Sequence, residues 1–432
     1  MARVRPFRAY TYARQSADIT SITSPPYDVI SEEQRARLLA RDANNVVALE
    51  LPEGPLDPEQ PGNRYETGAR RWLEWTTDGT LVHDEAPTLY VLEQKYETSN
   101  RTVTRRALIA EVGLEPFDAG VILPHERTLP KALGDRHALI EATAANFSQV
   151  LALYPDEENQ TGALFERAMQ GNPTMTATDS EGVESRVWAV TDTDITDDVT
   201  ALMSDKPIFI ADGHHRYTTA LAYRDARREA DTAIGATADG PSYDFVMMAL
   251  VNMDDPNLVV LPTHRVANTD AEFDSDTFFA ALDKYFDVIV LDDDEAHRAL
   301  EHTKCPAFII KTRGSEDLHL AQLRSEVDLD TVISTEHSSA WKHLDVAVLQ
   351  ELILDPVLDI HPDRSETLAR LTFVKDPHEA IRMVGDRDVA FILKATGKNQ
   401  MRAVSLEGDV MPQKSTYFYP KVLSGLVLRG MD

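Results

Sequence analysis

Cysteine is almost absent from this sequence, since its 432 residues include only Cys305. A single cysteine excludes an internal disulfide and any metal site built from several cysteines. Cys305 leads into the apolar stretch Ala307–Lys311, which we predict to be a strand. We therefore expect this side chain to serve packing rather than chemistry.

Long apolar runs are also missing. No stretch of about eighteen consecutive apolar residues occurs, so no membrane-spanning helix is expected. The N-terminal residues Met1–Pro6 pass directly into polar and aromatic sequence, which does not resemble a secretory leader. With the scarcity of cysteine, these features predict a cytoplasmic protein with no membrane partner.

Lysine is scarce as well, with 12 among the 43 basic residues, against 72 acidic residues and a formal net charge of -29. Such a surface repels the phosphate backbone of nucleic acid wherever salt does not screen it. DNA and RNA are therefore not expected as partners. The acid excess fits either adaptation to high ionic strength or an ordinary acidic protein, and both alternatives stay open.

The sequence contains neither a Gly-x-x-x-x-Gly-Lys phosphate loop nor a Gly-x-Gly-x-x-Gly fingerprint, and it has no repeats. A nucleotide would therefore have to be bound by a different structural motif. The length predicts two or three lobes. We place boundaries so that residues 1–269 form the main region, 270–325 a small inserted α/β lobe, and 326–432 a C-terminal α/β segment with a docked tail.

The most informative stretch runs from Pro207 to Arg224. Ile208–Ala211 predicts a short buried strand, Asp212-Gly213 a turn, and the spacing from His214 onward a helix. The first N–H groups of such a helix attract an anion. The predicted phosphate-binding residues are therefore Gly213, His214, His215 and Arg216. The alternative is a structural turn in which Asp212 caps the helix and the histidines are merely polar surface residues.

Two further strands are predicted to end in histidine and arginine. Val121–Pro124 precedes His125, Glu126, Arg127 and Thr128. A carboxylate between a histidine and an arginine stays ionised, as a general base requires, although a surface ion pair would give the same pattern. Leu258–Leu261 similarly leads to His264 and Arg265. Three such strand ends suggest one convergent polar site.

Two loops could complete that site. The proline pair in Ser24–Ser31 fixes the backbone around Tyr27 and Asp28, either as a structural corner or to hold both residues against a substrate. In the tail, Tyr417–Tyr419 lies between prolines and should be buried, because aromatic area favours burial. Lys414 and Lys421 flank it, and Lys414 is the candidate for contacting an anion.

Periodicity predicts the remaining elements of a mixed α+β fold. The stretches predicted as strands are 46–51, 89–97, 103–112, 150–154, 185–190, 244–251, 258–261, 288–291, 307–311, 318–323, 371–374 and 390–393. Helices are predicted over 65–76, 276–286, 295–303, 337–354, 378–384 and 400–405.

As a set, eight blocks resemble the domain-of-unknown-function family 1015 (DUF1015), and the turn resembles that of the ParB/sulfiredoxin superfamily. The blocks are Pro6–Arg8, Ser24–Ser31, Arg64-Tyr65, Trp72–Trp75, Leu123–Thr128, Asp212–Tyr217, Leu261–Arg265 and Met411–Lys421. The resemblance implies a ParB/sulfiredoxin-like core. Through the free-serine kinases, which use a similar Gly-His-His-Arg turn, it also implies binding of nucleotide phosphates.

By this resemblance the expected activity is transfer of a phosphoryl group from ATP or ADP, with Mg²⁺, to a small hydroxy compound, with serine as the best guess. Glu126 is the candidate base; Asp212 is second, and could instead hold the metal. The substrate-binding candidates are Tyr27, Asp28, His125, Arg127 and Thr128. A nucleotide-gated binding or regulatory protein is the first rival, and a metal-dependent hydrolase using His214 and His215 is the second.

Overall fold

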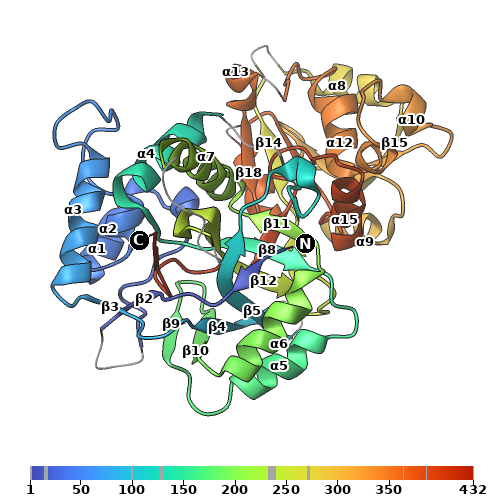
Figure 1. The fold of residues 1–432 in the computed structure, drawn as a ribbon. Helices are drawn as coiled ribbons and strands as arrows, with labels where there is room; N and C mark the ends of the chain where they lie inside the picture. The colour runs from blue at the N-terminus through green and yellow to red at the C-terminus, as the bar shows by residue number, and fades with distance from the viewer. Residues whose placement is uncertain are drawn as a thin grey trace. The chain divides into compact units, whose positions relative to one another are not determined.

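The computed structural model describes residues 2–13, 18–98, 101–126, 130–231, 240–269, 273–362, 364–385 and 387–431 (Figure 1). The chain forms two compact units. Unit 1 comprises Met1–Pro124, Thr128–Leu258 and Pro420–Asp432, and unit 2 comprises His125–Arg127 and Val259–Tyr419. Both units combine helices with sheet, so the expected α+β class is confirmed.

A mixed sheet forms the centre of unit 1. In the described residues it has nine strands in the order β6-β11-β8-β12-β5-β4-β10-β9, with β1 beside β5. The β6–β11 and β8–β12 pairs are parallel and the others are antiparallel. These strands are β1 (Val4–Arg5), β4 (Leu89–Glu97), β5 (Thr102–Gly113), β6 (Ile122–Leu123), β8 (Val150–Tyr154), β9 (Met175–Thr178), β10 (Glu184–Val190), β11 (Ile208–Asp212) and β12 (Phe245–Asn252).

Helices cover this sheet and bury its apolar side chains. Figure 1 shows α5 beside α6 and α4 beside α7, as their contacts also indicate. The helices of unit 1 are η1 (Tyr27–Val29), α1 (Glu32–Arg41), α2 (Val47–Glu50), α3 (Arg64–Thr77), η2 (Phe117–Ala119), α4 (Pro130–Thr143), α5 (Gln160–Ala168), α6 (Thr193–Ser204), α7 (His214–Ala230) and η3 (Ser242–Asp244). Two small ribbons complete the unit, β2 (Tyr10–Tyr12) with β3 (Leu81–His83) and β7 (Ala145–Asn146) with β21 (Arg429–Gly430).

Several helices start at side chains that the sequence makes recognisable. Ser31 and Gln34 form a capping box at α1, Asn63 caps α3, and Asp192 caps α6. Each cap satisfies N–H groups that the first helical turn leaves without an internal partner. Helix α7 differs, because Gly213 is its N-cap and no side chain caps it.

The prediction of a strand at 46–51 is wrong, since Val47–Glu50 forms the short helix α2. All four of its residues are buried, and the Asn45 side chain accepts a hydrogen bond from the Val47 N–H at 3.0 Å. A short, mostly apolar run such as Val46–Leu51 has no periodicity that separates a buried helix from a buried strand. The preceding asparagine was the available signal for a helix start.

Unit 2 is built on a six-stranded antiparallel sheet in the order β15-β17-β16-β19-β14-β18. Its strands are β14 (His264–Ala267), β15 (Phe286–Leu291), β16 (Ala307–Thr312), β17 (Leu318–Leu323), β18 (Leu371–Val374) and β19 (Val389–Ile392), and β13 (Val259–Leu261) pairs with β20 (Tyr417–Tyr419) outside it. The helices are α8 (Ser275–Leu282), α9 (Asp293–His302), α10 (Leu329–Val332), α11 (Ser339–Lys342), α12 (Asp345–Leu349), η4 (Gln350–Leu354), α13 (Ser365–Leu368), α14 (Pro377–Met383) and α15 (Lys398–Leu406).

This sheet differs from the predicted separate lobe over residues 270–325. Strand β16 pairs with β19, so the three strands of that stretch continue into a sheet with β14 and β18. The predicted helix over 337–354 is also divided, because Leu344 is extended between α11 and α12 and the last turn, η4, is a π-helix.

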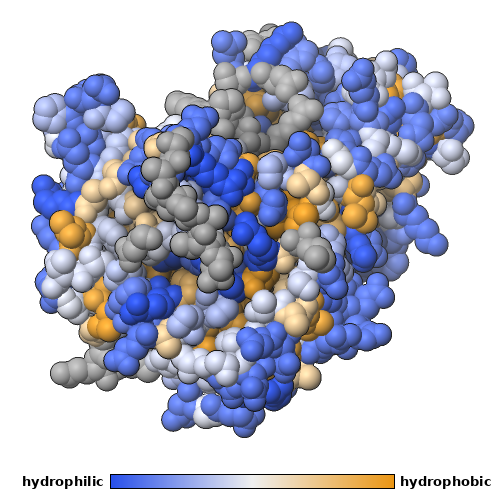
Figure 2. All heavy atoms as spheres, viewed as in Figure 1, coloured by the Kyte–Doolittle hydropathy of each residue, from blue (hydrophilic) through white to orange (hydrophobic). Residues whose placement is uncertain are grey.

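The tail is docked, as its aromatic content predicted. Phe418 is 1% exposed within β20 of unit 2, and Leu426, Val427 and Leu428 are fully buried in unit 1. No helix in the described part of the chain is long and apolar enough to cross a bilayer. The face drawn in Figure 2 consists mostly of hydrophilic residues.

Candidate functional site

The turn between β11 and α7 has the geometry that its sequence predicts. Strand β11 ends at Asp212, and Gly213 has φ +88°, a left-handed conformation that side chains disfavour. A Cβ at Gly213 would lie 2.7 Å from the Arg216 Nε, so the guanidinium folds directly over the glycine. The turn therefore needs glycine both for its backbone angle and for this close approach.

Asp212 is held by two cations within unit 1. Its carboxylate accepts a hydrogen bond from the Lys421 Nζ at 2.5 Å and one from the Arg216 Nη2 at 2.8 Å. Burial by itself would raise the pKa of Asp212, but Lys421 and Arg216 together hold it well below its usual range. Asp212 is thus an ion-paired carboxylate and not the helix cap of the structural alternative.

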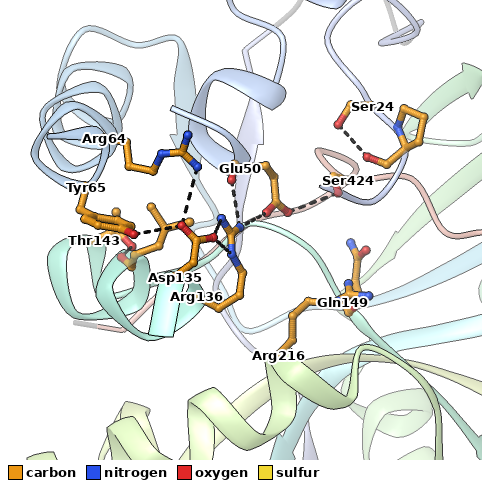
Figure 3. A network of polar contacts seen from close by, with 12 residues as sticks. Ser24, Glu50, Arg64, Tyr65, Asp135, Arg136, Thr143, Gln149, Arg216 and Ser424 are labelled. Atoms are coloured by element: carbon orange, nitrogen blue, oxygen red, sulfur yellow. Dashed lines mark hydrogen bonds and ion pairs between the residues drawn. The ribbon is translucent and has the colours of Figure 1, made fainter. Parts of the chain in front are cut away.

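Arg216 retains unused hydrogen-bonding capacity. Its Nη1 donates to the backbone oxygen of Gln149, while its Nε has no partner in the described part of the chain. The Gln149 side chain is 2% exposed, and neither its amide nitrogen nor its amide oxygen has a partner among the same residues. Figure 3 shows Gln149 beside the guanidinium of Arg216. Buried polar atoms without partners are uncommon, so this cluster suits a polar ligand or water.

A second guanidinium lies in the same polar region. Arg136 on α4 and Arg216 line one cavity of about 50 Å³, which Thr219 also borders. Among the described residues the hydroxyl of Thr219 has no hydrogen-bond partner. Two guanidinium groups on one cavity provide donors for an anion.

The network in Figure 3 fixes Arg136. Its Nε donates to Asp135 at 2.8 Å and its Nη1 to the backbone oxygen of Glu50 at 2.9 Å, and the Tyr65 hydroxyl donates to Asp135 at 3.0 Å. The guanidinium of Arg136 lies 4.2 Å from the centre of the Tyr27 ring. This network links residues that are far apart in the sequence and orients Tyr27 at the site.

The remaining predicted residues of unit 1 lie close to the turn. Burial raises the pKa of Tyr27 to about 12, against the opposing effects of Arg216 and Arg136. Asp28, next in η1, is exposed. His214 is buried at the start of α7, and His215 is partly buried. The alternative in which both histidines are surface residues does not fit the burial of His214.

Glu126 belongs to unit 2, where the tail surrounds it. Its carboxylate accepts hydrogen bonds from the backbone N–H groups of Lys414 at 3.2 Å, Ser415 at 3.1 Å and Thr416 at 3.3 Å. The His125 Nε2 lies 2.8 Å from the Thr416 hydroxyl and 3.4 Å from the Glu126 carboxylate. Because hydrogen bonds to the charged form stabilise it, this arrangement favours the ionised carboxylate.

His264 and Arg265 lie at the start of β14 in unit 2, and both are buried. The His264 Nδ1 accepts from the Leu393 N–H at 3.2 Å, its Nε2 has no partner, and burial lowers its pKa to about 4. Arg265 donates to the backbone oxygens of Thr263 and Lys414. The predicted residues Arg127 and Thr128 lie outside the described residues.

The predicted residues thus form two groups, one in each unit. Tyr27, Asp28 and the turn Asp212–Arg216 belong to unit 1, whereas His125, Glu126, His264, Arg265 and Lys414 belong to unit 2. One site built from both groups stays a prediction. Sequence reasoning missed Glu50, Arg136 and Gln149, for which no local pattern gave a signal. It named Lys421, with Lys414, as a lysine that could complete an anion site, but it did not predict the pairing of Lys421 with Asp212.

The described residues do not form a ready metal site. Among them there is no cluster of three His, Cys, Asp or Glu side chains that could hold a metal ion. Both oxygens of Asp212, the candidate ligand for Mg²⁺, already accept hydrogen bonds from Lys421 and Arg216. The donor set at the turn therefore does not fit Mg²⁺ in this arrangement.

A family model described as "Protein of unknown function (DUF1015)" matches residues 4–347. No curated protein matches the sequence. Similar solved structures include a conserved hypothetical protein from Pyrococcus furiosus, 15% identical with a TM-score of 0.35, covering 73% of this chain and 92% of that chain. A mutant free serine kinase in complex with ADP is 13% identical with a TM-score of 0.35, covering 74% and 92%. C-terminally truncated SbnI from Staphylococcus aureus is 12% identical with a TM-score of 0.34, covering 72% and 84%.

Proposed function

The chain belongs to the DUF1015 family, whose description assigns no function, and we propose that it is a nucleotide-dependent phosphotransferase for a small hydroxy compound. One observation carries the proposal. Helix α7 begins without a side-chain cap at a turn lined by Arg216 and Lys421, and the buried amide of Gln149 beside it has no partner. An uncapped helix N-terminus with cationic side chains is a site for phosphate.

The phosphates of ATP or ADP would bind along Gly213–Arg216. Arg216 would contribute its Nε and Lys421 its ammonium, each exchanging part of its interaction with Asp212 for the phosphate. Phosphoryl transfer depends mainly on positioning and on neutralising charge, and cationic side chains at a helix N-terminus provide both.

Glu126 would receive the proton of the acceptor hydroxyl, with Asp212 as the alternative. Both carboxylates are weak bases in the present arrangement, because each already accepts several hydrogen bonds. A weak base suffices where the transition state is loose and the hydroxyl loses its proton late. Serine is the first acceptor to test, because the sequence of the turn resembles that of the free-serine kinases.

The weak basicity of the Glu126 and Asp212 carboxylates also favours one rival function. If neither Glu126 nor Asp212 accepts a proton, the turn would bind a nucleotide without transferring its phosphoryl group. The protein would then be a nucleotide-gated binding or regulatory protein. Binding alone cannot separate these two functions, so the test must include turnover.

Calorimetric titration with ATP, ADP and AMP tests the anion site. We expect Arg216→Ala to weaken binding of ADP by about tenfold or more, since a charge-assisted hydrogen bond contributes on the order of 1.5 to 3 kcal/mol. Arg227→Ala is the matched control, because Arg227 lies on the same helix but pairs with Asp231 near its far end. Equal ADP affinity in the parent and in Arg216→Ala would exclude the turn as the phosphate site.

Transfer of labelled phosphate from ATP or ADP to serine, with and without Mg²⁺, then tests the activity. Phosphoserine formation by the parent, reduced in Arg216→Ala, is the expected result. Nucleotide binding without transfer to serine or to other small hydroxy compounds would instead favour the nucleotide-gated binder.

A further inference from the structure

Unit 2 contains a cavity of about 180 Å³ that the proposed phosphotransfer does not use. It lies among α11, α12, η4, β18 and residues 410–413, all within that unit. Much of its wall is apolar and includes the side chains of Trp341, Leu354, Leu368, Leu371 and Phe373. A concave apolar cavity with a few polar groups is the usual form of a small-molecule site.

Arg265 supplies a cation to this cavity. The residue is 4% exposed, and its guanidinium lies 5.4 Å from the centre of the Phe373 ring. Its hydrogen bonds go to the backbone oxygens of Thr263 and Lys414, which occupy two of the five N–H donors of an arginine. Burial lowers the pKa of Arg265 to about 10, so the group remains charged at neutral pH.

Two other arginines have carboxylate partners that Arg265 lacks. Arg216 pairs with Asp212 and Arg429 with Glu111, whereas no carboxylate in the described residues lies within ion-pair distance of Arg265. A buried charge is costly unless it is paired and hydrogen-bonded. An anionic ligand in the cavity would supply the missing partner.

Thr335 contributes another polar group to the lining of this cavity. Its hydroxyl is buried and has no hydrogen-bond partner in the described residues. Opposite charge is also present, since Glu351 is another lining residue. The cavity thus offers one guanidinium and one hydroxyl to a ligand, but a doubly negative ligand would also meet the carboxylate of Glu351.

The apolar wall is held in a defined shape. The Trp341 ring stacks on His337 at 4.0 Å and 10°, and the His337 Nδ1 lies 2.8 Å from Asp409. The π-helix η4 widens the adjacent turn, and its Gln350 side chain donates to the Ile360 oxygen at 2.9 Å. Single π turns inside helices occur often at functional sites. A fixed aromatic plane in the wall of a cavity that also contains a cation suits a ligand with a flat or branched apolar body.

We propose that this cavity binds a monocarboxylate with an aromatic or branched apolar body. The carboxylate would accept hydrogen bonds from Arg265 and Thr335, and the body would pack against Trp341 and Leu371. Planar guanidinium groups bind carboxylates in a bidentate manner, and a single negative charge meets less repulsion from the Glu351 carboxylate than a double charge would. The site does not depend on the turn of unit 1, so it stands whether or not phosphoryl transfer is found.

The test uses 3-phenylpropionate as the probe, with calorimetry and tryptophan fluorescence as readouts. The matched neutral compound is 3-phenylpropionamide, and phenyl phosphate is the dianion. We expect the acid to bind at least about tenfold more tightly than the amide, because a charge-assisted contact to Arg265 is lost in the amide. Phenyl phosphate should bind more weakly than the acid. Equal binding of acid and amide, or no saturation by the acid at millimolar concentration, would overturn the proposal.

Two variants locate the site on the protein. Arg265→Gln should lose the preference for acid over amide, while Arg298→Gln, which changes an exposed arginine on α9, should keep it. Because Arg265 is buried and its loss could unfold unit 2, Leu368→Trp provides a second variant that fills the cavity and leaves the cation. Undiminished binding of 3-phenylpropionate by a folded Leu368→Trp protein would exclude this cavity.

Discussion

Asp212 in unit 1 is the last residue of β11 and Glu126 in unit 2 comes shortly after β6, but different kinds of partner hold their carboxylates. Asp212 lies between the side chains of Lys421 and Arg216. Glu126 accepts backbone N–H groups of Lys414, Ser415 and Thr416. Side-chain cations can be recruited by a phosphate, whereas backbone N–H groups fix the tail itself. The comparison indicates that the turn of unit 1 is suited to exchanging anions and the loop of unit 2 to holding a segment in place.

Replacing each carboxylate by its amide gives the most direct test. We expect the largest effect for turnover in Glu126→Gln, because the amide cannot accept a proton. Phosphoryl transfer should fall by roughly two to four orders of magnitude, while ADP affinity stays close to that of the parent. The rate of transfer from labelled nucleotide to the best acceptor is the measurement. Full activity in this variant would transfer the role of base to Asp212.

Asp212→Asn should affect stability more than any other substitution at the turn. It leaves Lys421 and Arg216 without their carboxylate, and breaking a buried pair in this way costs roughly 3 to 5 kcal/mol of unfolding free energy. Denaturant unfolding measures the loss. The control is Asp231→Asn, whose partner Arg227 is about half exposed, with an expected change below about 1 kcal/mol.

Added anions give a second test of the turn in the Asp212→Asn variant. Pyrophosphate should raise the unfolding temperature of Asp212→Asn more than that of the parent, because a ligand that binds the folded state stabilises it and the two cations no longer pair with the Asp212 carboxylate. An equal shift in both proteins would contradict the view that the turn exchanges its carboxylate for a phosphate.

Asp345 is a third carboxylate and has one cationic partner. It shows how burial raises the pKa of a carboxyl group when ion pairing is weaker. Burial raises its pKa to about 6, although the Lys394 ammonium lies 3.6 Å away. The folded pKa is above the unfolded value, so the protonated carboxyl stabilises the fold at low pH, and this contribution is lost as pH rises through about 6. The loss amounts to roughly 2 kcal/mol between pH 4 and 7.

Asp345→Asn removes this titration without changing the shape of the side chain. Stability of the parent relative to Asp345→Asn should therefore decrease over that pH range, as followed by denaturant unfolding at several pH values. Parallel pH profiles for the two proteins would show that Asp345 has an ordinary pKa.

The sequence was sufficient for features that depend on neighbouring residues. The strand, glycine turn and helix around Asp212 follow from local spacing, as does the β4–β5 hairpin. The sequence was insufficient at Val47–Glu50, where a short, mostly apolar run has no clear periodicity. The stacking of Arg136 on Tyr27 joins residues of α4 and η1, and no local pattern encodes such a contact.

Sequence reasoning also could not assign the contacts of single residues in the tail. Both tail lysines could be recognised as candidates, and Lys414 was preferred for the anion. The structure instead brings the ammonium of Lys421 to Asp212, while the backbone of Lys414 donates to Glu126 and accepts from Arg265. Which of two nearby lysines pairs with an acidic side chain depends on the path of the folded chain. Their spacing in the sequence does not determine that path.

Unit 1 is assembled from three separate segments of the chain, and this has a consequence for biosynthesis. Its last strand and Lys421 leave the ribosome only after the whole of residues 259–419 has been made, a delay on the order of ten seconds or more at ordinary elongation rates. During that interval Asp212 lacks Lys421, and Glu111 lacks Arg429, whose Nε it later binds. Before Lys421 and Arg429 are made, Asp212 can pair with Arg216 and Glu111 with Arg5, so the contacts of these two tail residues are among the last contacts of unit 1 to form.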